Sequence, residues 1–189
     1  SDVKLTTGGD LALEATVALG AGDLTLNANG NVSQLAAGAI TANGLQILGS
    51  GIVRLDTAAN NVITLAANHT GTISYTDTND LTVSTVSDTA AALGISSSGI
   101  TNSDSDVKLT TGGDLSLEAA IALGAGDLTL NANGNVSQLA AGAITANGLQ
   151  ILGSGTVRLD TAANNVTTLA ANHTGTISYT DTSSLTIGT

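Results

Sequence analysis

The stretch GDLTLNANGNVSQLAAGAITANG occupies residues 22–44, and the same letters return unchanged at residues 126–148. Within it, short segments such as LTL and VSQ alternate apolar and polar residues and are separated by an Asn-Gly turn and an Ala-Gly turn. Alternation with a period of two is typical of β-strands. Gly and Asn tolerate the positive φ values that tight turns need. The stretch therefore predicts brief strands joined by tight turns, and its return predicts a repeat architecture.

The repeat extends well beyond this stretch. The two occurrences start 104 residues apart (126 − 22), and aligning Ser1 with Ser105 pairs residues 1–85 with residues 105–189. We therefore divide the chain into a first unit, residues 1–104, and a second, shorter unit, residues 105–189, which continues the same solenoid. Because the second unit ends before its pattern is complete, we expect the chain to be a segment of a longer array. The aligned positions differ only at Ala12/Ser116, Thr16/Ala120, Val17/Ile121, Ile52/Thr156, Ile63/Thr167, Asn79/Ser183, Asp80/Ser184, Val83/Ile187 and Ser84/Gly188.

The spacing of the strand-like segments predicts an all-β fold, a parallel β-helix or β-solenoid. Three short strands for each turn of the chain give about 21 residues per rung, and the 104-residue unit would hold about five such rungs. The whole chain would then form about nine rungs, with the second unit stacked on the first in register. No segment keeps the 3.6-residue apolar period of a helix. Residues 85–103, TVSDTAAALGISSSGITNS, fit the pattern least well, and we expect a looser rung or a loop there.

Composition supports a thin core. The chain has two Tyr as its only aromatic residues, with no Phe or Trp, and no Pro, Cys or Met. Wide cores are normally filled by aromatic side chains, so this core must be thin enough for Val, Ile, Leu, Ala and Thr to fill. Alternation predicts that Val17 points inward, while Ala12, Lys4 and Arg54 point to solvent.

The charge limits the classes of partner. Fifteen acidic residues against four basic ones give a net charge of −11. Such a surface repels nucleic-acid phosphates and anionic lipids. No apolar run approaches the roughly 20 residues that span a bilayer. We expect neither nucleic-acid binding nor membrane insertion.

Two acidic turns are the only metal candidates, TDTND at residues 76–80 and NSDSD at residues 102–106. They gather the hard oxygen ligands that Ca²⁺ prefers, although neither matches the EF-hand loop. Apart from calcium at these turns, no cofactor is expected. The candidate calcium ligands are Asp77, Asp80, Asp104 and Asp106.

Catalysis is not expected. Polysaccharide lyases and hydrolases, which include right-handed β-helices, gather several carboxylates and basic groups in one irregular groove. Here Glu14 and Glu118 are the only glutamates, and nearly every polar feature occurs twice. His69 and His173 occupy equivalent positions and are interpreted as solvated turn residues. A polysaccharide-binding or polysaccharide-cleaving β-helix is the remote alternative.

The segments DVKLTTGGDLALEA, GDLTLNANGNV, AGAITANGLQILGSG and LTIGT resemble the central repeats of filamentous-haemagglutinin-like adhesins, large bacterial exoproteins exported by two-partner secretion. The resemblance covers essentially the whole chain and is one of repeat style. It implies a right-handed parallel β-helix, secreted or on the bacterial cell surface, that gives length and stiffness to a stalk or fibre used in adhesion or biofilm. Its partners would be neighbouring repeats and an unidentified host or cell-surface receptor. The alternative is an extracellular matrix filament that assembles end to end through homotypic contacts.

Overall fold

Alternating apolar residues and Gly-rich turns produce strands that pair in parallel from one turn of the chain to the next. The computed structural model describes residues 1–87, 93–94 and 96–188, and none of these residues forms a helix that could cross a membrane. The strands are β1 (Val3–Thr7), β2 (Leu11–Leu13), β3 (Val17–Ala18), β4 (Asp23–Ala28), β5 (Val32–Gln34), β6 (Ile40–Ser50), β7 (Val53–Thr70), β8 (Ile73–Asp77), β9 (Leu81–Val83), β10 (Thr85–Ser87), β11 (Ser96–Ser98), β12 (Ile100–Asn102), β13 (Val107–Thr111), β14 (Leu115–Leu117), β15 (Ile121–Ala122), β16 (Asp127–Ala132), β17 (Val136–Gln138), β18 (Ile144–Asp181) and β19 (Thr186–Ile187).

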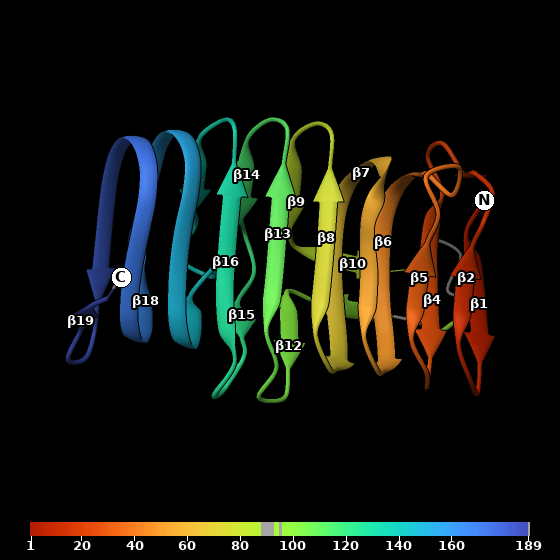
Figure 1. Cartoon of the computed structure of the whole chain (residues 1–189), viewed down its shortest axis with the longest axis horizontal. Coiled ribbons are helices and arrows are strands. Elements are labelled where there is room, and N and C mark those ends of the chain that lie inside the picture. The colour runs from red at the N-terminus through yellow and green to blue at the C-terminus, as the bar shows by residue number, and fades with distance from the viewer. Residues whose placement is uncertain (88–92, 95, 189) are drawn as a thin grey trace.

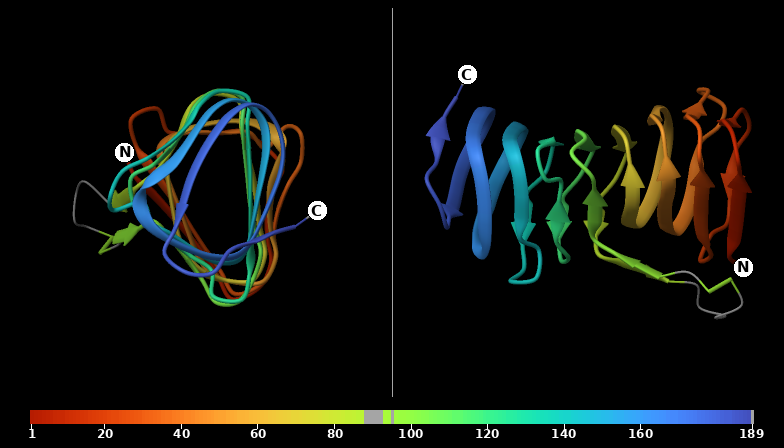
Figure 2. Two further views of the ribbon diagram at one scale, coloured as in Figure 1. Left: turned by 90° about the vertical axis from the view of Figure 1, so that its left-hand side faces the viewer. Right: turned by 90° about the horizontal axis from the view of Figure 1, so that it is seen from below.

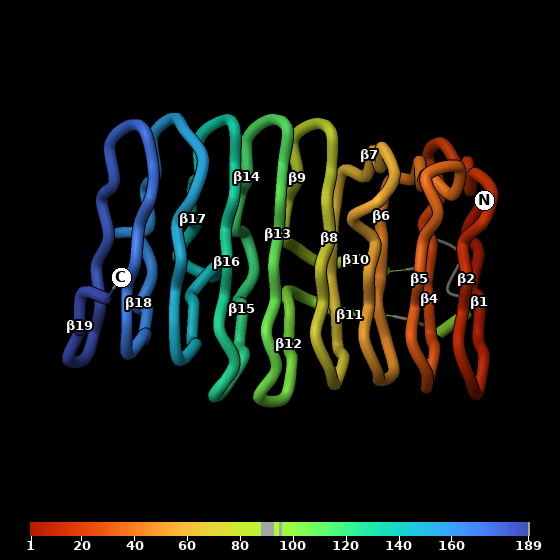
Figure 3. Tube along the Cα trace, viewed as in Figure 1, coloured from red at the N-terminus to blue at the C-terminus, as the bar shows by residue number. Residues whose placement is uncertain are grey.

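The chain winds as a right-handed parallel β-solenoid of about nine turns with a spacing of about 21 residues, which confirms the predicted fold class (Figure 1). Val3 pairs with Leu24, Leu24 with Leu45, and Leu45 with Leu65. All strands except β10 and β11 belong to one 17-stranded sheet. In β7 and β18 the extended backbone continues around the corners of the solenoid, as the Cα trace shows (Figure 3).

Stacked aliphatic side chains fill the interior of the closed cross-section seen end-on in Figure 2. One such ladder consists of Leu26, Ile47, Ala67, Ile100, Ile121 and Ile144, all buried and paired in register. The residues predicted to face solvent, Lys4, Ala12 and Arg54, are exposed. Val17, predicted to point inward, is partly buried against the core, and its counterpart Ile121 is fully buried. The core is not purely aliphatic, however, because the ring of Tyr75 is fully buried in it.

The second unit does not stack on the first in register, which corrects the prediction of five whole rungs. From one turn to the next, Leu11 pairs with Val32, Val32 with Val53, Val53 with Ile73 and Ile73 with Val107. Val107 is the counterpart of Val3 and not of Leu11. Equivalent residues of the two units therefore lie on different sides of the solenoid. The cause is an insertion: four pairing steps join Val3 to Val83, and the chain then leaves the stack before it rejoins at Ile100.

The insertion is a β-hairpin that lies outside the solenoid. β10 pairs antiparallel with β11, with Val86 opposite Ser97. At its base the Gly99 N–H donates to the Ser84 carbonyl at 2.9 Å, and Gly99 has a φ of 68°. The hairpin runs back along the solenoid towards its N-terminal end (Figure 2). The expected loop at 85–103 is thus a hairpin followed by β12, while residues 88–92 and 95 lie outside the described residues.

Candidate functional site

The four candidate calcium ligands all bind backbone N–H groups. Asp77 is buried, and its carboxylate accepts hydrogen bonds from the Tyr75 hydroxyl at 2.7 Å and from the Val62 and Asn79 N–H groups at 2.9 Å. The other three accept bonds from the next turn. These pairs are Asp80 with the N–H of Asp114 (2.8 Å), Asp104 with that of Ala125 (2.8 Å) and Asp106 with that of Asp127 (3.0 Å).

This use of aspartate is general along the solenoid. Asp10 accepts the N–H of Asn31, and Asp114 that of Asn135, both at 2.7 Å. Charge-assisted bonds of this kind are stronger than neutral ones, so the acidic turns join successive rungs. Among the described residues, no group of three or more His, Asp or Glu side chains could hold a metal ion. Calcium binding at the acidic turns stays a prediction.

The interpretation of the two histidines as solvated turn residues is wrong. His69 lies in β7 and is only 1% exposed, with its Nε2 2.9 Å from the Gly51 carbonyl oxygen. His173 is half-buried, and its Nε2 lies 3.0 Å from the carbonyl oxygen of Gly155. The sequence AANHTG resembles a turn, but β7 extends as strand through its Asn, His and Thr to Thr70, and β18 continues past the whole motif.

Each unit contains a hydrogen-bonded Tyr-Asp pair, Tyr75–Asp77 in the first and Tyr179–Asp181 in the second. The pKa values of the two aspartates differ because the pairs differ in burial. Burial, together with the neighbouring Asp77 carboxylate, raises the pKa of Tyr75, and burial also raises the pKa of Asp77. At Asp181 burial acts in the same direction, but hydrogen bonds from Tyr179, Ser183 and Val166 outweigh it and lower the pKa. The difference follows from stacking, since β13 pairs with β8 over the first pair.

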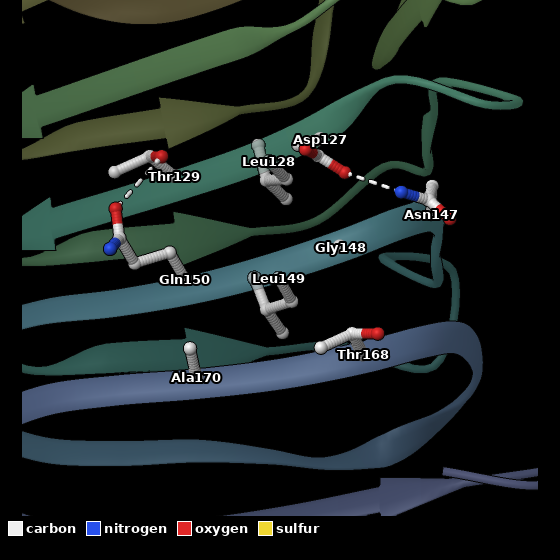
Figure 4. A pocket seen from close by; sticks show the side chains of 9 residues that line it. All are labelled: Asp127, Leu128, Thr129, Asn147, Gly148, Leu149, Gln150, Thr168 and Ala170. Atoms are coloured by element: carbon white, nitrogen blue, oxygen red, sulfur yellow. Dashed lines mark hydrogen bonds between the residues drawn. The ribbon is translucent and has the colours of Figure 1, made fainter. Parts of the chain in front are cut away.

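A groove of about 340 Å³ lies on the outer face of β16 and β18, and we call it the second-unit groove (Figure 4). The Asp127 carboxylate accepts a 2.9 Å hydrogen bond from the Asn147 amide, and the Thr129 hydroxyl donates to Gln150 Oε1 at 3.4 Å. Leu128 and Leu149, which also line the groove, belong to the hydrophobic core. The lining residues are Asp127, Leu128, Thr129, Asn147, Gly148, Leu149, Gln150, Thr168 and Ala170.

The groove offers hydroxyl and amide groups and one carboxylate, with no basic side chain. It can therefore exchange hydrogen bonds with a polar, uncharged segment of extended backbone. Sequence reasoning missed it, because its residues alternate with core positions and look like ordinary outward-facing strand residues. The only available signal was that the motif spanning Asp127 to Gln150 repeats Asp23 to Gln46 letter for letter.

The continuous sheet and the 104-residue repeat define the chain as a tandem-repeat β-solenoid. Its residues 1–68 and 104–173 match the model of a family described as repeats of unknown function (DUF5649), and the chain belongs to this family. Comparisons with curated proteins and with solved structures gave no match.

Proposed function

We propose that the chain is a length-giving stalk or fibre segment of an extracellular bacterial adhesin or surface filament. The observation that carries the proposal is the direct pairing of the two units. β8 and β9 of the first unit pair in parallel with β13 and β14 of the second, so the sheet passes from one unit to the next without a break.

The core is also continuous across this junction. Tyr75 of the first unit pairs with Leu109 of the second, and both side chains are fully buried in one hydrophobic cluster. In solenoids each repeat is stabilised mainly by its neighbours, so a junction of this kind stabilises the rod like the contact between any other two rungs. The extracellular and adhesive part of the proposal is supported by the resemblance of the repeats to filamentous-haemagglutinin-like adhesins.

Rod length tests the mechanical part. Chains with one, two and four copies of residues 1–104 would be imaged by electron microscopy and measured by small-angle X-ray scattering. Each copy supplies a little more than four turns, so each should add about 20 Å at the usual spacing of paired strands. A length that stops growing with copy number would contradict the proposal.

A matched pair of variants tests the junction. Leu109→Asp places a charge in the shared core and should break or bend the rod there, whereas Lys108→Asp changes an exposed neighbour and should leave it straight. Location is tested separately, by labelling intact cells of the producing bacterium with an antibody against the repeat. Labelling that appears only after lysis would refute the extracellular assignment.

The same preparations test end-to-end assembly. Sedimentation velocity over a wide range of concentrations would show filaments if the units associate, and a monomer throughout would rule this alternative out.

A further inference from the structure

The second-unit groove has an exact sequence counterpart in the first unit, and there the hairpin β10–β11 covers it. Val86 of the hairpin is buried, and a Cβ atom on Gly44 would come within 2.8 Å of its Cγ1. On the other strand of the hairpin, Ser97 Oγ accepts a 2.7 Å hydrogen bond from Gln46 Nε2. The hollow that remains is about 190 Å³ and is partly lined by Val86 itself.

Burial of identical residues shows what the hairpin does. Gln46 is 1% exposed, whereas its counterpart Gln150 is exposed. The same change from buried to more accessible separates Asp23 from Asp127, Thr25 from Thr129, Gly44 from Gly148 and Ala66 from Ala170. Most of these residues lie in inner turns, so the cover, and not the end of the stack, accounts for the difference.

The Asp-Asn hydrogen bond at the floor of the groove is the same with and without the cover, whereas the Thr-Gln bond is 3.0 Å under the hairpin and 3.4 Å without it. The Asn43 amide donates to Asp23 at 2.9 Å under the hairpin, and the Asn147 amide donates to Asp127 at 2.9 Å without one. A surface that keeps its bound geometry while empty loses little entropy on binding. In the described part of the chain, Gln150 Nε2 makes no hydrogen bond, although its counterpart Gln46 donates to Ser97.

The attachment point is also present. β9, from which the hairpin departs, pairs Thr82 with Thr64, and its counterpart β19 pairs Thr186 with Thr168 in the same way. A hairpin that leaves the stack after β19 would therefore start at the same place relative to the groove as β10–β11 does in the first unit.

We propose that the second-unit groove is a docking site for a β-hairpin with the sequence of residues 85–99, joined in cis directly after β19. The hairpin's apolar residue corresponding to Val86 packs against Gly148, and its serine corresponding to Ser97 accepts the free Gln150 amide. This inference does not rest on the stalk function, because it concerns the side of the solenoid and not its length.

Cysteine labelling tests the proposal, since the chain contains no cysteine. Thr25→Cys reports on the covered groove and Thr129→Cys on the open one, and both changes nearly preserve side-chain size. In the 189-residue chain we expect a thiol reagent to modify Thr129→Cys at least about tenfold faster than Thr25→Cys, because the covered site reacts only after local opening.

The chain is then extended after Thr189 by a copy of residues 86–104. The labelling of Thr129→Cys should slow to the rate of Thr25→Cys, and adding Gly148→Val, whose side chain occupies the space of the incoming valine, should restore fast labelling. Hydrogen exchange of residues 147–150 in the unsubstituted chains provides a second measurement if a cysteine variant fails to fold.

Three outcomes would overturn the proposal. The extension could leave labelling and exchange unchanged, or the slowing could persist in Gly148→Val. Labelling of the 189-residue chain could also slow as its concentration rises, which would assign the groove to a second molecule instead of a hairpin in cis. Rod length plays no part in these measurements, so the stalk function and the docking site can fail separately.

Discussion

Gln34 Nε2 donates a 2.6 Å hydrogen bond to Asn60 Oδ1, and both side chains are buried. Asn60 Oδ1 also accepts the Ile40 N–H at 3.0 Å, and Asn60 Nδ2 donates to the carbonyls of Leu55 and Thr76 at 3.0 Å. One amide thereby connects three successive turns at the place where the pairing register shifts. The same bonds recur around Asn164 in the second unit.

Removing this amide should be costly. Asn60→Ala leaves the Ile40 N–H and the two carbonyls without their buried partner, and we expect a loss of about 3 kcal/mol of unfolding free energy. Asn61→Ala, at the exposed neighbouring position, should change it by less than about 0.5 kcal/mol. Urea unfolding followed by circular dichroism measures both, and equal losses would refute the structural role of Asn60.

The two Tyr-Asp pairs should respond to acid in opposite ways. The pKa of Asp77 is raised in the folded state, so its contribution to stability is complete below its ordinary value and is lost as the pH rises through the folded pKa. The unfolding free energy of the wild type relative to Asp77→Asn should therefore increase as the pH falls from 7 towards 4.

For Asp181 the sign is reversed. Its folded pKa is lowered, so its stabilisation is present above its ordinary pKa and is lost as the pH falls through the folded value. Relative to Asp181→Asn, the wild type should lose stability only below about pH 4, the ordinary range of an Asp carboxyl. Denaturant titrations between pH 7 and pH 3 check both, and parallel pH profiles for the two variants would contradict the difference in burial.

Gly49 should not tolerate a side chain. It has a φ of 97°, and a Cβ there would collide with the Ala28 carbonyl oxygen of the preceding turn. Gly49→Ala should cost about 2 kcal/mol or more, because both the backbone conformation and the space forbid it. Gly8→Ala is the control, since no atom lies within 4 Å of its added Cβ. Thermal unfolding of the two variants should differ by several degrees, and similar melting temperatures would count against the tight stacking at Gly49.

Filling the two grooves should have unequal effects. Gly44→Val competes with Val86 for space and should displace the hairpin at a cost of about 1–3 kcal/mol, typical of overpacking. At Gly148 the three atoms nearest to an added Cβ all belong to the Asp127 side chain, which can rotate away. Hydrogen exchange of residues 85–87 and 96–98 should therefore rise in Gly44→Val and stay unchanged in Gly148→Val. A rise in both would mean that the hairpin is not held by this groove.

The local structure followed from the sequence because it depends on local signals. Alternation gave the inward positions of Leu24 and Leu26, and Gly-rich turns gave the spacing of the rungs. The register of the second unit did not follow, since it depends on whether residues 85–99 lie inside or outside the stack. Only packing against the distant Gly44 and Gln46 decides that. The burial of His69 was missed for a related reason, as no local signal shows that a turn-like motif continues as strand.

The second-unit groove could not be predicted from local sequence either. Gln46 and Gln150 have identical sequence neighbours, yet one is buried and the other is exposed. What separates them is the hairpin after β9, whose Ser97 contacts Gln46 from 51 residues further along the chain. Pattern reasoning assigns both residues to an outer face, and it cannot tell a covered outer face from an open one.

The shift of register between the units has a consequence for how rods could lie against one another. The groove that the hairpin covers in the first unit lies on β4, β6 and β7. The second-unit groove lies on β16 and β18. It is on the side of the solenoid that β2, β5 and β8 form in the first unit. Units joined in this way would carry their hairpins at positions that are rotated about the solenoid axis from one unit to the next. The hairpins would then interrupt the lateral surface along which two parallel rods could pack.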